Sequence, residues 1–213
     1  MNKLDSGHTD SYYAASAPAA ADYPSLEANI ETETCVIGGG FAGLTAASEL
    51  ARQGRGVVLL EARRIGWGAS GRNGGFVSPG YSGDTFALER QLGKARTRAL
   101  YDLSRQGAEY VRGNLSQPGF AGILGGQGRL RLSRHGAADG LRAIRRRLEE
   151  DYGHRFEYWD TDRVRQCLRT RRYHQALHDP EAFAIEPLAY ANALAAAAHI
   201  APPRYRSSRT LVT

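Results

Sequence analysis

The sequence predicts an α/β fold whose first part is a strand–helix–strand unit with parallel strands. Residues 35–43, CVIGGGFAG, pass from an apolar strand into a glycine-rich turn, and residues 41–53 place apolar side chains at helical spacing. A second apolar run at residues 56–60, GVVLL, is typical of a buried parallel strand. With 213 residues, the chain is long enough for one sizeable core or two small ones.

Each glycine of the first turn has a separate physical role. Gly38 allows a sharp turn out of the strand, Gly40 allows the backbone to approach a phosphate, and Gly43 allows the helix to pack closely on the sheet. The helix that starts at Phe41 and Ala42 points its free N–H groups and its positive dipole end at the same place. The spacing therefore predicts a Rossmann-like dinucleotide site; the alternative is a glycine-rich turn that binds nothing.

An acidic residue follows the second strand. Glu61 lies at the carboxyl end of that strand, where its carboxylate is expected to accept hydrogen bonds from ribose hydroxyls. A carboxylate at this position repels a 2′-phosphate, which disfavours NADP. Gly54 is expected to end the preceding helix as its C′ residue.

A second glycine-rich segment, GWGASGRNGGF at residues 66–76, follows. This many glycines cost chain entropy unless the backbone approaches something closely, and the rest of the cofactor is the expected partner. Ser70 and backbone N–H groups are expected to bind a pyrophosphate or a sugar chain, Arg72 to supply positive charge, and Asn73 to bond a ring edge. The alternative is a surface loop.

The remaining elements follow from caps and periodicity. Residues 1–30 are expected to form an extended arm anchored by Tyr12, Tyr13 and Tyr23. Helices are expected at 84–115 with Asp84 as N-cap, at 137–152, at 160–168 with Asp160 or Thr161 as cap, and from Pro187 to near His199; strands are expected at 122–133, 156–159 and 173–177. Only two strands of the parallel sheet are evident.

Charge and composition narrow the classes of function. The net charge is +6, but the basic residues are almost all arginines dispersed among acidic ones, which favours solvated helix faces over nucleic-acid binding. The first ten residues lack the apolar core of a secretory signal, and no apolar run has the length of a membrane span. Two cysteines without metal or disulfide spacing favour a cytoplasmic protein.

Taken together, the motifs resemble FAD-dependent oxidoreductases of the D-amino-acid oxidase type. The resemblance rests on residues 35–43, 61–68 and 69–75 and extends from about Asp10 to Ala198. Residues 11–15, SYYAA, and 22–27, DYPSLE, are most similar to the bacterial gamma-glutamylputrescine oxidase-like members. The second glycine-rich segment is the most specific part of the resemblance.

The resemblance implies a flavoprotein that oxidises an amine or amino acid. Hydride would pass from the carbon bearing nitrogen to flavin N5, the imine would hydrolyse, and oxygen would be reduced to peroxide. The expected FAD contacts are Gly38, Gly40, Phe41, Ala42 and Gly43 at the pyrophosphate, Glu61, Ala62 and Arg63 at the adenosine end, and Ser70, Gly71, Arg72, Asn73, Gly74 and Gly75 along the ribityl chain. No catalytic residue is predicted.

The resemblance also implies a division of the chain. We expect an arm at 1–30, an incomplete Rossmann-like FAD-binding domain at 31–115, part of an α+β substrate domain at 116–185, and at 186–213 a returning helix with an aberrant tail. Ile185-Glu186-Pro187 replaces a His-Pro pair common in relatives, and the pattern dissolves after Ala198. These departures suggest the amino-terminal part of a longer enzyme, ended by a frameshift or premature stop.

Two other functions stay open at this point. The first is a catalytically inactive fragment that folds partially or binds only nucleotide. The second is an NAD-dependent dehydrogenase, which would share the first glycine-rich turn but would have no use for the segment at 66–75.

Overall fold

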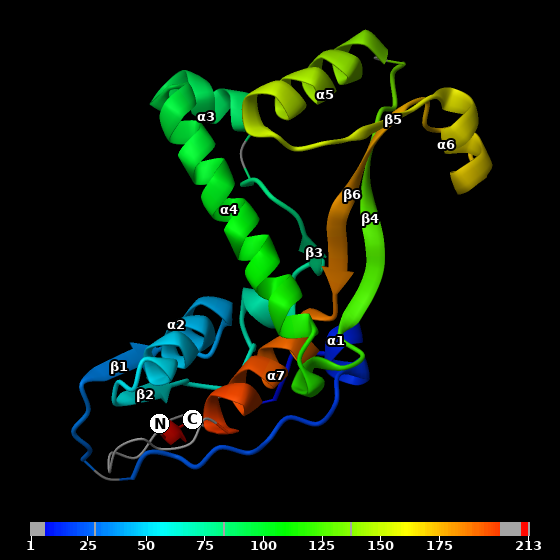
Figure 1. Cartoon of the computed structure of the whole chain (residues 1–213). Coiled ribbons are helices and arrows are strands. Elements are labelled where there is room, and N and C mark those ends of the chain that lie inside the picture. Colours follow the sequence, from blue (N-terminus) through cyan, green and yellow to red (C-terminus); the bar gives the residue numbers. More distant parts are fainter. Residues whose placement is uncertain (1–6, 28, 83, 137, 201–209, 213) are drawn as a thin grey trace. The chain divides into compact units, whose positions relative to one another are not determined.

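The structure is a computed structural model of the chain (Figure 1). It describes residues 7–27, 29–82, 84–136, 138–200 and 210–212. The chain divides into two compact units: unit 1 comprises residues 1–75, 116–123 and 185–213, and unit 2 comprises residues 76–115 and 124–184. The domain boundaries expected from the sequence stay predictions.

Unit 1 contains a parallel sheet. Strands β1 (Thr34–Ile37), β2 (Val57–Leu60) and β7 (Thr210–Val212) lie in the order β1-β2-β7. Cys35 is opposite Val58 in the first pair, which confirms the predicted parallel unit. The expectation of only two evident strands was wrong, because β7 pairs in parallel with β2. A strand of three residues is too short to show a periodic pattern.

Helix α2 (Phe41–Arg52) follows β1 as predicted. It buries Leu44, Ala47 and Ala51, the apolar positions that repeat at helical spacing. Gly54 has a positive φ of 82°, and the following N–H of Arg55 donates to the Leu50 carbonyl, so the predicted glycine end of the helix is confirmed.

Helix α7 (Pro187–Ile200) packs against α2 and completes the core of unit 1. It starts at Pro187, as predicted. The Tyr190 ring lies 5.4 Å from the Phe41 ring and 5.6 Å from that of Phe120, which belongs to the short helix η2 (Pro118–Phe120). Burial on nearly every side suits this alanine-rich helix.

The amino-terminal arm is not extended throughout, which corrects the prediction. It contains helix α1 (Tyr12–Ser16), whose N-cap Ser11 accepts a hydrogen bond from the Ala14 N–H at 3.2 Å. Tyr12 is 78% exposed and is therefore not an anchor, whereas Tyr13 and Tyr23 are partly buried. A helix of five residues is too short for its pattern to be recognised.

Unit 2 combines four helices with an antiparallel sheet. The helices among its described residues are α3 (Thr85–Leu92), α4 (Lys94–Leu115), α5 (Ala138–Tyr152) and α6 (Thr161–Leu168). Its strands are β3 (Phe76–Val77), β4 (Leu124–Leu132), β5 (Glu157–Trp159) and β6 (Ala176–Ile185). The sheet order is β3-β6-β4, and β5 also pairs with β6.

Two predicted elements of unit 2 were wrong in extent. The single helix at 84–115 is two helices, because Gly93 has a φ of 80° that ends α3. The strand at 173–177 is instead β6, which continues to Ile185 through a polar stretch containing the fully buried Asp179. The predicted caps held: Asp84 accepts from the Phe86 N–H at 2.7 Å, and Asp160 accepts from the Arg163 N–H at 2.9 Å.

Among the residues described, no helix has both the length and the apolar character that a bilayer crossing requires. The same residues contain no group of three or more His, Cys, Asp or Glu side chains that could together hold a metal ion.

Candidate cofactor site

The turn between β1 and α2 is held by close backbone contacts. Gly38 has a φ of 109°, a conformation that other residues rarely adopt, and its N–H donates to the Leu60 carbonyl at 2.7 Å. A Cβ on Gly43 would lie 2.0 Å from the Gly38 carbonyl oxygen. Only glycine at position 43 therefore lets α2 start this close to the turn.

The amino terminus of α2 presents backbone donors. Gly40 is the N-cap and has no side chain to cap the helix, and the first intrahelical bond runs from the Leu44 N–H to the Gly40 carbonyl. Helix geometry leaves the N–H groups of Ala42 and Gly43 without an intrahelical acceptor. A Cβ on Gly38 would meet no atom within 4 Å, so there is free space at the turn. These features fit an anion such as a pyrophosphate.

The second glycine-rich segment lies directly against this turn. The Ser70 hydroxyl oxygen accepts a hydrogen bond from the Phe41 N–H at 3.0 Å, and the Gly39 carbonyl accepts from the Gly66 N–H at 2.9 Å. A Cβ on Gly40 would lie 2.8 Å from the Ser70 oxygen. The structure therefore brings the two segments together at the amino terminus of α2, although more than twenty residues separate them in sequence.

Glu61 closes the other side of the turn from the end of β2. Its carboxylate accepts from the Gly39 N–H at 2.6 Å and from the Arg63 N–H at 2.9 Å, one bond to each oxygen. Each carboxylate oxygen has a second lone pair, so this half-buried group can still accept hydrogen bonds from a ribose.

Two arginines of the site stack on one indole. The guanidinium carbon of Arg63 lies 3.6 Å from the centroid of the Trp67 ring and that of Arg72 lies 4.6 Å from it. Arg72 also donates to the Gly68 carbonyl and to the Thr9 hydroxyl. The Trp67 platform was not predicted from the sequence, although an indole with Arg63 before it and Arg72 after it is a readable signal.

The surroundings are electropositive. Burial, followed by the positive charges of Arg64 and Arg72, lowers the pKa of His8. A cavity of about 320 Å³ lies nearby, between arm residues such as Tyr23 and the segment Ala62–Ile65 that follows Glu61. Positive charge beside free helix N–H groups favours phosphate binding.

The later residues of the second glycine-rich segment make contacts that stabilise the conformation of the segment itself. The Asn73 amide donates to the carbonyls of Ala69 and Ser70 at 3.2 and 2.9 Å, and its oxygen accepts from the Gly75 N–H at 2.8 Å. A Cβ on Gly71 would lie 2.2 Å from the Gly66 carbonyl oxygen, and one on Gly75 the same distance from that of Ile185. Close packing within the protein explains these glycines; Gly74 is exposed.

A parallel strand, glycine-rich turn and helix, with a carboxylate at the end of the second strand, define a dinucleotide-binding protein of the Rossmann type. The chain belongs to the FAD dependent oxidoreductase family, whose pattern it matches over residues 33–201. The expected resemblance to this family is thereby confirmed.

Individual relatives are oxidoreductases. The chain is 47% identical to gamma-glutamylputrescine oxidoreductase of Escherichia coli over 105 residues, which are 49% of this chain and 25% of that protein. It is 29% identical to a probable oxidoreductase OrdL of Haemophilus influenzae over 199 residues, 89% of this chain and 44% of that one. The chain thus spans less than half the length of these two relatives.

Solved structures show the same fold. An L-amino acid deaminase from Proteus myxofaciens, solved in complex with anthranilate, superposes with a TM-score of 0.66 at 19% identity over 84% of this chain and 39% of that one. A glycine oxidase from Bacillus cereus gives 0.57 at 20% identity over 85% and 46%. At these identities the likeness supports the α/β fold class alone.

Proposed function

We propose that the chain supplies the FAD-binding part of an oxidase for amines or amino acids, and that it represents the amino-terminal portion of that enzyme. The observation that supports this most directly is the contact between the two glycine-rich segments at the start of α2, through Ser70 and Phe41. An NAD site of the Rossmann type needs only the first segment, so the contact favours FAD.

Each residue of the site would have a defined part in holding FAD. The N–H groups of Ala42 and Gly43 would donate to the pyrophosphate, and Arg63 and Arg72 would add positive charge from the Trp67 platform. Glu61 would accept from ribose hydroxyls while its bonds to Gly39 and Arg63 fix its orientation. When bound, FAD would supply the oxidising chemistry by accepting a hydride from the carbon that bears nitrogen.

The substrate, the use of oxygen as acceptor and a cytoplasmic location belong to the same proposal. A small amine or amino-acid substrate is supported by the 47% identity to the gamma-glutamylputrescine oxidoreductase of Escherichia coli over about half of this chain. A second candidate, a chain that binds only adenine nucleotide, is supported by Ile37, which is 86% exposed at the end of β1. Strand β1 is an edge strand of the parallel sheet, so Ile37 leaves an apolar position at this edge uncovered.

Expression of residues 1–213, followed by removal of free flavin by gel filtration, tests the proposal. Visible flavin absorbance that coelutes with the protein supports FAD binding, and peroxide release with a panel of amines tests activity. Binding of ADP without binding of FAD would contradict the proposal and support the second candidate.

A matched pair of variants tests the site itself. Glu61→Gln removes the carboxylate charge and is expected to weaken FAD binding about tenfold, the loss of roughly one charge-assisted hydrogen bond. Glu31→Gln removes the same charge from an exposed position of unit 1 and is expected to bind FAD like the unchanged chain. Equal loss in both variants would contradict the role of Glu61.

A further inference from the structure

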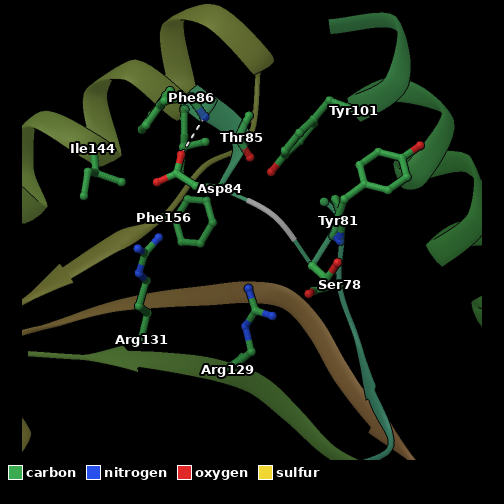
Figure 2. Close-up of a pocket in the computed structure, with 14 residues that line it drawn as sticks. Ser78, Tyr81, Asp84, Thr85, Phe86, Tyr101, Arg129, Arg131, Ile144 and Phe156 are labelled. Atoms are coloured by element: carbon green, nitrogen blue, oxygen red, sulfur yellow. Dashed lines mark hydrogen bonds between the residues drawn. The ribbon is translucent and has the colours of Figure 1, made fainter. Parts of the chain in front are cut away.

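Unit 2 contains a cavity of about 470 Å³ that the proposed function does not use. Figure 2 shows it between β4, the start of α3, and side chains of α4 and α5. All of its lining residues belong to unit 2. One wall is apolar and is formed by Phe86, Ile144, Leu148 and Phe156.

Two arginines face the cavity from the opposite side. Arg129 and Arg131 are two residues apart on β4, so they share one face of the strand, about 7 Å apart along it. Figure 2 shows both side chains rising from the strand toward Phe156 and Tyr101. Arg129 is half-buried and Arg131 is exposed.

The protein does not neutralise these arginines. Within the described part of the chain, neither guanidinium has an ion-pair or hydrogen-bond partner, whereas other arginines of unit 2, such as Arg147 and Arg163, pair with carboxylates. Asp84 is the one carboxylate among the described lining residues, and it already accepts from the N–H groups of Phe86 and Ala87 as the cap of α3. The cavity is therefore positive on balance.

Tyr101 does not compensate the positive charge. Its hydroxyl is hydrogen-bonded to Nδ1 of the buried His154 at 2.6 Å. Burial, reinforced by the charge of Asp179, raises the pKa of Tyr101 to about 12, while the charge of Arg129 acts in the opposite direction. The phenol is neutral at physiological pH, so the wall carries no phenolate.

We propose that this cavity is a binding site for a small organic carboxylate with an apolar body. The carboxylate would bond to Arg129 and Arg131, whose planar guanidinium groups match its two oxygens, and the apolar body would lie against Phe86 and Phe156. The lining residues of this cavity belong to unit 2, whereas the proposed FAD contacts are residues of unit 1.

The test uses the full chain with FAD present and 3-phenylpropionate as the probe. We expect saturable binding, with NOEs from the probe ring to the methyl groups of Ile144 and Leu148. Arg129→Gln and Arg131→Gln are each expected to weaken binding at least about tenfold, since each removes a charge-assisted hydrogen bond. Arg171→Gln, an exposed arginine outside the cavity, is the matched control and is expected to bind the probe like the unchanged chain.

Several results would overturn the proposal. They are unchanged affinity in both cavity variants, equal affinity for the uncharged 3-phenylpropionamide, and NOEs only to residues elsewhere. Inorganic phosphate binding as tightly as the probe would also contradict it, because the apolar wall would then contribute nothing. Circular dichroism of each variant reports whether it is folded. If Arg129→Gln fails to fold, the affinity of the Arg131→Gln variant still tests the proposal, because Arg131 is exposed.

Discussion

Each of the two compact units has its conformation stabilised by a different kind of contact. In unit 1, the conformation depends on close contact between backbone segments. Gly43 lies against Gly38, and Gly71 lies against Gly66, at distances that exclude any Cβ. In unit 2 the conformation depends on side chains, such as the buried series Tyr101, His154 and Asp179. A binding site made of backbone N–H groups needs the first kind of construction, because side chains at those positions would fill the ligand's space.

The side-chain series of unit 2 is almost fully enclosed. Tyr101 is bonded to His154 Nδ1 at 2.6 Å, and His154 Nε2 to Asp179 Oδ1 at 2.9 Å. His154 and Asp179 have no exposed surface. The Asp179 oxygen also accepts from the N–H groups of Glu181 and Ala182, which fixes the middle of β6. Here a polar network, and not glycine, determines the conformation of the strand.

The largest expected effect is that of Gly43→Ala in unit 1. The new Cβ would lie 2.0 Å from a backbone oxygen that cannot move without displacing α2. We therefore expect the unfolding free energy to fall by about 3 kcal/mol or more, and FAD binding to be lost. Hydrogen exchange resolved by residue measures the loss in unit 1. Gly119→Ala, where the Cβ position is open, is the control; equal effects would show that backbone approach at Gly43 is unimportant.

A slightly smaller effect is expected in unit 2. His154→Phe keeps an aromatic ring but leaves the buried Asp179 without its side-chain partner, which should cost about 3 kcal/mol. Tyr101→Phe removes one hydrogen bond to His154 and should cost about 1–2 kcal/mol. Chemical denaturation measures both, with Tyr173→Phe as the control. If His154→Phe were as stable as the unchanged chain, the network would not determine this unit.

The pair Gly71→Ala and Gly68→Ala sharpens the comparison within unit 1. Gly71 has a Cβ position 2.2 Å from the Gly66 carbonyl oxygen, whereas that of Gly68 is open. We expect a loss of about 2 kcal/mol for the first variant and almost none for the second. Thermal unfolding in the presence and absence of FAD checks this. A larger effect of Gly68→Ala would mean that the glycines serve the cofactor and not the packing.

The smallest effect concerns a surface ion pair of unit 2. Asp151 accepts a hydrogen bond from Lys94 at 2.6 Å, and this bond, with a further contribution from Arg147, lowers the pKa of Asp151. A lowered pKa in the folded state adds stability above the ordinary Asp pKa, and this stability is lost as the pH falls through the folded value.

Lys94→Gln is therefore expected to lose less than about 1 kcal/mol at neutral pH. Its stability should approach that of the unchanged chain in acid, below the lowered pKa of Asp151, where this carboxyl is protonated in both proteins. Denaturation at the two pH values measures the difference, and Arg171→Gln is the control for a lost charge. A difference that grows in acid would contradict the assignment.

Local patterns in the sequence predicted much of the fold. Caps at Asp84 and Asp160, the glycine end at Gly54 and the proline start of α7 were correct, because each depends on neighbouring residues only. The errors came from longer range. The strand expected at 173–177 is instead β6, which continues through Asp179 because His154, far along the chain, bonds to its carboxylate. Gly93 ends a helix that periodicity alone would continue.

The sequence by itself determined the class of ligand, because glycines at fixed spacing and a carboxylate after the second strand act through local geometry. Only the tertiary structure decided how the site is built. It joined Ser70 to Phe41, set Arg63 and Arg72 on Trp67, and assigned Asn73 and Gly71 to packing. These contacts join backbone and side chains whose proximity depends on the path of the intervening chain, which no local pattern records.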